Sequence, residues 1–133
     1  MYLVDTNVIC ELSRQNPNQG VVDWFQRQRS ICLSAVTVEE MSFGIERLPA
    51  GQNLRLLEWF GKLLAIPPEI LAVDGKVAQL AGQLRARREK AGRTVAQADM
   101  LIAATALVFG RILVTRNTKD FSECGVTVLN PFA

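Results

Sequence analysis

The sequence has no histidine among its 133 residues. Histidine is the side chain whose ordinary pKa lies closest to neutrality, and it is a frequent general base and zinc ligand. Its absence excludes Ser-His-Asp and Cys-His nucleophile systems and zinc sites that are built on histidine. Any catalysis must therefore use carboxylates, hydroxyls, amides, Lys, Arg or a bound metal ion.

Cysteine is scarce, and Cys10, Cys32 and Cys124 lie far apart in the chain. Their odd number and the lack of a Cys-x-x-Cys pair argue against a disulfide framework and a zinc knuckle. They are typical of reduced core thiols in a cytoplasmic protein, so we expect a cytoplasmic location. No basic leader precedes the first apolar residues, and the longest apolar run (residues 100–110) is too short to span a bilayer. We therefore expect no secretion signal and no membrane association.

What the sequence does contain is enough apolar material for a folded core. Hydrophobic residues make up 49% of the chain, and the mean hydropathy is +0.14. A chain of this length typically forms one domain that buries roughly two-thirds of its unfolded surface, so we predict a single domain over residues 1–133. The net charge is only +2. The distribution of charge, rather than its sum, must therefore indicate any anionic partner.

Five short apolar runs predict strands, and helical patterns separate them. The strands are expected near residues 2–4, 31–34, 70–73, 112–115 and 126–129. Three of these runs show no polar alternation, which is typical of parallel strands that are covered on both faces. The sequence therefore predicts an α/β fold of three layers, in which helices cover both faces of a mostly parallel five-stranded sheet.

Local signals predict several helix boundaries. Thr37 and Glu40 have the spacing of a capping box, which predicts a helix start at Thr37 and gives Glu40 a structural alternative. A residue within 94–97 is expected to cap the long apolar helix that follows. Pro67 and Pro68 are expected to end the helix that precedes the third strand.

Four acidic residues follow predicted strands or lie in the first turns of predicted helices. They are Asp5, Glu40, Asp99 and Asp120. Asp5 has the alternative role of a helix cap, and Asp120 that of a first-turn acid favoured by the helix dipole. Asp99 is harder to explain in this way, because Ile102 and Ala106 place it on an apolar helix face. A buried carboxylate without a partner costs several kcal/mol, and no basic residue lies on that face within a turn.

The four acids together predict a catalytic, all-oxygen metal site at the carboxyl edge of the sheet. Hard oxygen ligands suit Mg²⁺, with Mn²⁺ as a substitute. Such sites bind substrates that carry phosphate. The neutral side chains expected to orient the carboxylates and their waters are those of Thr6, Asn7, Thr115 and Asn117.

Basic residues lie close to these acids in the sequence. They are Arg85, Arg87, Arg88, Lys90 and Arg93, which precede Asp99, and Arg116 and Lys119, which precede Asp120. Such a group is often an ordinary solvated helix face. Beside a carboxylate pocket, it predicts contacts with the phosphates of the substrate.

Several segments of the chain match one known family, in order and from end to end. They are LVDTNVI at 3–9, TVEEM at 37–41 with Gly44, QADMLIAATA at 97–106, LVTRNTKDF at 113–121 and VLNPF at 128–132. The sequence resembles the PIN-domain family, in particular the VapC and FitB toxins of bacterial toxin–antitoxin pairs.

This resemblance implies an α/β/α PIN-like fold and a magnesium-dependent endoribonuclease that acts as a toxin. It places the metal ligands at Asp5, Glu40, Asp99 and Asp120, and a supporting polar role at Thr115 and Asn117. Glu40 is preferred to Glu39 because the family's acid precedes an aliphatic residue, with a glycine four positions on. The resemblance also implies an RNA substrate, a homodimer, and a small VapB- or FitA-like antitoxin that joins it in a hetero-oligomer and fills the active-site groove.

Two alternatives remain open. A PIN nuclease of RNA processing, without an antitoxin, shares the same chemistry and differs only in its partner. A phosphoacceptor receiver domain, which belongs to signalling rather than catalysis, would use Asp74 as phosphoacceptor and Thr115 as switch hydroxyl. That alternative requires paired acids after the first strand and a lysine after the last, and this chain has neither.

Overall fold

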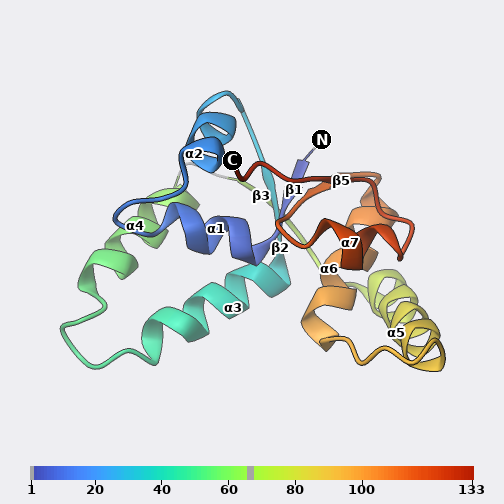
Figure 1. The fold of residues 1–133 in the computed structure, drawn as a ribbon. Coiled ribbons are helices and arrows are strands. Elements are labelled where there is room, and N and C mark those ends of the chain that lie inside the picture. Colours follow the sequence, from blue (N-terminus) through green and yellow to red (C-terminus); the bar gives the residue numbers. More distant parts are fainter. Residues whose placement is uncertain (1, 66–67) are drawn as a thin grey trace.

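A computed structural model describes residues 2–65 and 68–133, so that Pro67, one of the two prolines expected to end a helix, lies outside the described residues. The helices are α1 (Thr6–Leu12), α2 (Gln19–Gln26), α3 (Ala35–Glu46), α4 (Leu54–Ala65), α5 (Gly75–Lys90), α6 (Gln97–Phe109) and α7 (Thr118–Ser122) (Figure 1). The strands are β1 (Tyr2–Val4), β2 (Cys32–Ser34), β3 (Glu69–Leu71), β4 (Ile112–Val114) and β5 (Val128–Leu129). Within the described ranges, no helix is both long and apolar enough to cross a membrane.

The strands form one sheet in the order β3-β2-β1-β4-β5, and every neighbouring pair is parallel. The chain adds β2 and β3 on one side of the central strand β1, and later adds β4 and β5 on the other side. In open α/β sheets, the point where the strand order reverses is a crevice at the carboxyl ends of the strands, and ligands bind there. Asp5 follows β1 and Thr115 follows β4, so both residues lie at this crevice.

Helices pack on both faces of the central strands β1 and β4, whose successive side chains point to opposite faces of the sheet. Leu3 and Leu113 pack with apolar residues of α5 and α6, whereas Val4 and Val114 pack with residues of α1 to α4. Figure 1 shows the two groups of helices on either side of the sheet. The predicted three-layer α/β/α architecture is confirmed, and its five-stranded sheet is parallel throughout.

The start of α3 differs from the prediction. Ser34 caps this helix, since its hydroxyl oxygen accepts the N–H of Val36 over 3.1 Å, and the helix begins at Ala35. Thr37 is fully buried inside the helix, so the predicted capping box with Glu40 is wrong. The reason is that β2 runs directly into the helix through a residue that is itself a good cap. Glu40 therefore lies in the second turn, and no capping role occupies its carboxylate.

The start of α6 also differs from the prediction. Ala96 occupies the cap position, and no side chain there accepts a backbone N–H, so the predicted side-chain cap within 94–97 is wrong. Asp99 lies in the first turn of this helix, whose free N–H groups favour a nearby negative charge. At the other end, Gly110 has a left-handed backbone conformation (φ 64°) that favours glycine, and it turns the chain into β4.

Candidate active site

Asp5 lies at the centre of the crevice and is only 3% exposed. Its Oδ1 accepts the backbone N–H of Thr6 over 2.7 Å, and its Oδ2 accepts the Thr115 hydroxyl over 2.8 Å. Burial raises the pKa of Asp5 to about 6, although these two hydrogen bonds lower it; the charges of Asp99 and Glu40 raise it further. The ionised form of Asp5 is therefore disfavoured at this position unless a cation is near.

Glu40 reaches the same crevice from α3. Its Oε1 accepts the hydroxyl of Thr6 over 2.7 Å, and the Thr6 Oγ1 lies 3.0 Å from the Oγ1 of buried Thr37. This small polar contact joins the first turn of α1 to α3. The hydroxyl of Thr6 thereby orients the carboxylate of Glu40.

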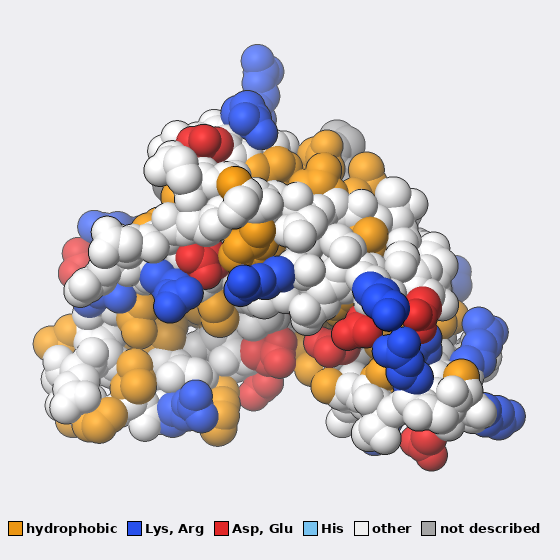
Figure 2. Space-filling view, in the orientation of Figure 1, with side chains coloured by type: hydrophobic (Ala, Val, Ile, Leu, Met, Phe, Trp, Pro, Cys, Tyr) orange, Lys and Arg blue, Asp and Glu red, His pale blue; other side chains and the backbone are white. Residues whose placement is uncertain are grey.

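Asp99 completes the acidic surface from the first turn of α6, where it is half-buried. Burial raises the pKa of Asp99, and the charges of Glu40 and Asp120 raise it further. A cavity of about 550 Å³ lies between these elements, and Figure 2 shows a hollow with acidic side chains on both sides. It is lined by Asp5, Thr6, Asn7, Cys10, Glu11, Arg14, Glu40, Asp99 and Asn117.

Asp120 lies beside this cavity rather than in it. Its side chain is 59% exposed, and its Oδ1 lies 3.5 Å from a guanidinium nitrogen of Arg93. It lines a smaller cavity of about 160 Å³, and Asp99 lines both cavities. The structure therefore brings Asp5, Glu40 and Asp99 to one cavity and places Asp120 next to them. In the part of the chain that is described, no three carboxylate or thiol side chains converge closely enough to enclose an ion by themselves.

Thr115 connects the ends of β1 and β4. Its fully buried hydroxyl donates to Asp5 and accepts the backbone N–H of Asn117 over 3.1 Å. The side-chain nitrogen of Asn7 also donates to the Thr115 hydroxyl over 3.4 Å. The side-chain oxygen Oδ1 of Asn7 accepts the backbone N–H of Arg116, also over 3.4 Å. These contacts orient the Asp5 carboxylate and hold the loop after β4 against α1.

Comparison with known proteins agrees with this arrangement. The sequence profile of the PIN domain matches residues 2–126. The chain belongs to the PIN-domain family. It is 34% identical to the VapC ribonuclease Y4jK of Sinorhizobium fredii, over 99% of this chain and 98% of that protein. It is 36% identical to the toxin FitB of Neisseria gonorrhoeae, over 99% of each.

Solved structures show the same likeness. The chain resembles the crystal structure of FitAcB from N. gonorrhoeae with a TM-score of 0.86 and 36% identity, over 98% of each chain. These comparisons confirm the predicted PIN-domain family and its VapC/FitB group, and with them the prediction that the protein is a nuclease.

The receiver alternative is wrong. The strand order of this PIN domain places β1 at the centre, next to β2 and β4, whereas receivers have the order 2-1-3-4-5. Asp74, its required phosphoacceptor, is engaged as a helix cap, since its Oδ1 accepts the N–H of Val77 over 2.9 Å at the start of α5.

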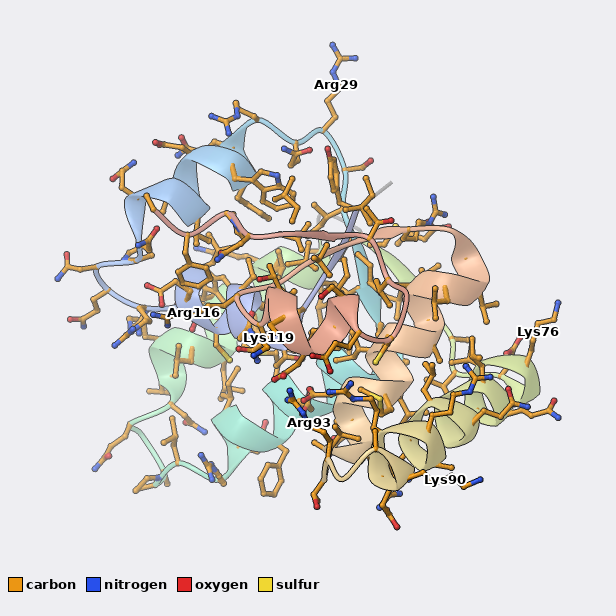
Figure 3. The ribbon with its side chains drawn as sticks, turned by 45° about the vertical axis from the view of Figure 1, so that its right-hand side comes forward. Arg29, Lys76, Lys90, Arg93, Arg116 and Lys119 are labelled. Carbon is orange, nitrogen blue, oxygen red and sulfur yellow. The ribbon has the colours of Figure 1, made fainter. Side chains whose placement is uncertain are left out.

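The basic residues of α5 do not share one surface in this PIN domain. Arg88 lies on the core face of the helix, is only 8% exposed and forms an ion pair with Glu123. It is therefore not free to bind a phosphate, and the predicted RNA contact of Arg88 is not supported. Arg85 and Arg87 are exposed on other sides of the helix. Figure 3 shows that Lys90 extends outward from α5.

Three other basic residues form a line near the cavity. Figure 3 shows Arg116, Lys119 and Arg93 one after another along the side of the molecule that carries α7. Arg116 follows β4, Lys119 lies in α7, and Arg93 follows the end of α5. Of these three residues, Arg93 contacts Asp120 directly and lines the smaller cavity with it.

Sequence reasoning missed three residues that line the main cavity: Cys10, Glu11 and Arg14. A signal was available, because these residues lie three, four and seven positions after Asn7, and a helix places such positions on one face. Cys10 is exposed and lines the cavity, so the prediction that it is a core thiol is wrong. Cys32 is buried and Cys124 is half-buried against the core, in closer agreement with the prediction.

Proposed function

We propose that the protein is a Mg²⁺-dependent endoribonuclease and the toxin of a bacterial VapBC-type toxin–antitoxin pair. One observation supports it most: Asp5, Glu40 and Asp99 come from three different elements and line one cavity at the crevice of the sheet. Their burial and mutual repulsion raise the pKa values of Asp5 and Asp99. A folded chain that collects such charges at one place is expected to bind a cation there.

The donor set fits Mg²⁺, with Mn²⁺ as a substitute. Mg²⁺ prefers oxygen ligands, keeps several water molecules, and is usually held by one or two carboxylates together with substrate phosphates. It therefore does not need three carboxylates that converge on one point, which agrees with the spread of these side chains. We assign Asp5, Glu40 and Asp99 to its binding site, one or two of them in direct contact and the rest through its water molecules, and Asp120 as a fourth acid at the outer edge. The bound ion would polarise the phosphate and lower the pKa of a water molecule.

The neutral residues of the site have positioning roles in this proposal. Thr115 and the N–H of Thr6 hold both oxygens of Asp5, and the Thr6 hydroxyl holds Glu40. Asn117 lines the cavity, where its side chain is available to a water molecule or to the substrate. Because the chain has no histidine, we infer that water, rather than the 2′-hydroxyl of the RNA, is the nucleophile. Cleavage then leaves a 5′-phosphate and a 3′-hydroxyl.

The relatives support the toxin assignment over a nuclease of RNA processing. They include proteins named toxin FitB, VapC ribonuclease Y4jK and, in Shigella flexneri, tRNA(fMet)-specific endonuclease VapC. We propose by analogy that this single domain, residues 1–133, forms a homodimer, binds a VapB- or FitA-like antitoxin in a hetero-oligomer, and acts on RNA in the cytoplasm.

The test is cleavage by the purified protein. We expect it to cut RNA in Mg²⁺ or Mn²⁺, to lose this activity in EDTA and to recover it when Mg²⁺ is restored. Sequencing of RNA 5′ ends after brief expression in cells identifies the target. Co-expression with the product of a neighbouring small gene should abolish cleavage and yield a stable complex. Undiminished cleavage in EDTA would contradict the metal assignment, and a neighbour that neither binds nor inhibits would favour the RNA-processing alternative.

A further inference from the structure

Three charged residues at one edge of the acidic cavity have no role in the mechanism above. They are Glu11, Arg14 and Arg116, and we call them the Glu11 rim. Glu11 and Arg14 line the cavity itself. Arg116 follows Thr115, and its backbone N–H donates to Asn7, which also lines the cavity.

Glu11 is a fixed anchor within this rim. Its side chain is only 10% exposed, and its Oε2 accepts the backbone N–H of Asn18 over 2.8 Å. Its Oε1 accepts from Arg14 over 3.2 Å. The hydrogen bond from Asn18 is the largest cause that lowers the pKa of Glu11, and the charges of Arg14 and Arg116 lower it further. The ionised carboxylate is therefore favoured, and it is hydrogen-bonded to the guanidinium group of Arg14.

Arg14 has most of its hydrogen-bonding capacity to spare. Its side chain is 68% exposed, and only one of its nitrogens contacts Glu11. A guanidinium group has five N–H donors in a planar fork that matches phosphate oxygens. Arg14 thus presents free donors at the mouth of the cavity, from a position fixed by Glu11.

Arg116 is oriented by the C-terminal tail. Its guanidinium carbon lies over the Phe132 ring, 4.8 Å from the ring centre, and the residue is exposed to solvent. The tail is held at Asn18, whose side chain donates to the Ala133 carbonyl over 3.2 Å and accepts the Ala133 N–H over 3.1 Å. Asn18 therefore fixes Glu11 through its backbone and the Phe132 segment through its side chain.

We propose that Arg14 and Arg116, held by Glu11 and Phe132, form a phosphate-binding site for an RNA backbone phosphate next to the one that is cleaved. Arg14 lines the cavity, and the backbone of Arg116 is bonded to Asn7, which also lines it. Together with Glu11, the two guanidinium groups leave one net positive charge beside the other three acids of the cavity. A polyanion approaching that cavity needs such an attraction, because the acids repel it. The inference rests on the proposed ribonuclease function and adds a substrate-binding site to it.

The test compares two double variants that remove the same charge. Arg14→Gln/Arg116→Gln removes the rim cations, whereas Arg27→Gln/Arg29→Gln removes two exposed cations just after α2 that line neither acidic cavity. Binding of a short single-stranded RNA is measured by fluorescence anisotropy in EDTA over a range of salt concentrations, so that the RNA is not cleaved. We expect the rim variant to lower the salt slope by about 1.4, at about 0.7 for each lost phosphate contact. The Arg27→Gln/Arg29→Gln variant should keep the wild-type slope.

Phe132→Leu tests the positioning role of the tail. It keeps an apolar side chain in place of the ring and leaves the charge of Arg116 unchanged. In Mg²⁺ we expect it to raise KM with little change in kcat, and to have no further effect on KM once Arg116 is already Gln. An effect of the same size in both backgrounds would show that the ring acts on general stability and not through Arg116.

These outcomes separate the rim from the catalytic proposal. Equal salt slopes for the wild type and the rim variant, or no RNA binding by the wild type in EDTA, would overturn the rim proposal whether or not cleavage occurs. RNA binding that depends on the rim, in a protein that cuts no RNA in Mg²⁺, would overturn the proposed nuclease chemistry and leave the rim as a phosphate site.

Discussion

Asp99 is the residue at which function and stability are most clearly opposed. Burial, Glu40 and Asp120 all raise its pKa, so its ionised form is disfavoured without a cation. We expect Asp99→Asn to reduce cleavage by more than about 100-fold, since residues that only support a metal ligand already change activity by about 10- to 100-fold. The Tm in EDTA should stay equal or rise, because a buried charge is removed. Cleavage assays and thermal denaturation in EDTA measure the two effects.

Asp74→Asn is the matched control. It makes the same chemical change at a helix cap that lines neither cavity, and Asn caps helices about as well as Asp. We expect wild-type cleavage from this variant. Near-normal activity of Asp99→Asn, together with normal metal affinity, would remove Asp99 from the metal site.

At the level of elements, the ion pair between Arg88 and Glu123 joins α5 to the segment after α7. Arg93 reaches the same group, since one guanidinium nitrogen lies 3.5 Å from Glu123 and another 3.5 Å from Asp120. Among the residues that the structure describes, the Nε and one terminal nitrogen of Arg88 are buried without a hydrogen-bond partner, so loss of Glu123 would leave this cation without its ion-pair partner. We infer that this pair holds α7, and therefore Asp120, beside Asp99.

Glu123→Gln tests this connection, and the pKa of Glu123 indicates how the contribution of the ion pair to stability depends on pH. The hydrogen bond from Arg88 lowers the pKa of Glu123, so the native state favours the ionised carboxylate. The stabilisation is present above the ordinary glutamate pKa of about 4.3 and is lost as the pH falls through the lower folded value. We expect Glu123→Gln to lower the Tm at pH 7, and the difference from the wild type to shrink in acid. Glu58→Gln, which removes an exposed i,i+4 pair with Lys62, is the control and should change the Tm little.

For the molecule as a whole, the missing histidine predicts the chemical outcome of cleavage. An RNA with one 2′-deoxy nucleotide just 5′ of the scissile phosphate should still be cut, because water is the proposed nucleophile. The products should carry a 5′-phosphate and a 3′-hydroxyl, which enzymatic end-labelling or mass spectrometry distinguishes. A 2′,3′-cyclic phosphate product would overturn this mechanism and with it the functional assignment of the four acids.

The sequence alone determined the kinds of elements, their order and the type of site. Hydrophobic periodicity located every strand to within a few residues, because β1 and β4 are apolar throughout and each other strand keeps two adjacent apolar residues. The acids were visible because they interrupt apolar runs at strand ends and helix starts. The boundaries were less accurate: β3 spans residues 69–71 where 70–73 were expected, and β5 spans only 128–129 of the expected 126–129.

Only the tertiary structure decided which charged side chains meet. Local patterns did not reveal that Ser34, rather than Thr37, caps α3, or that Arg88 is buried against Glu123 while Arg14 reaches the cavity. The physical reason is that contacts such as those of Thr115 with Asp5, or of Glu40 with Thr6, join residues far apart in sequence. They depend on the order in which parallel strands are added to the sheet, and on which face each helix turns toward the crevice.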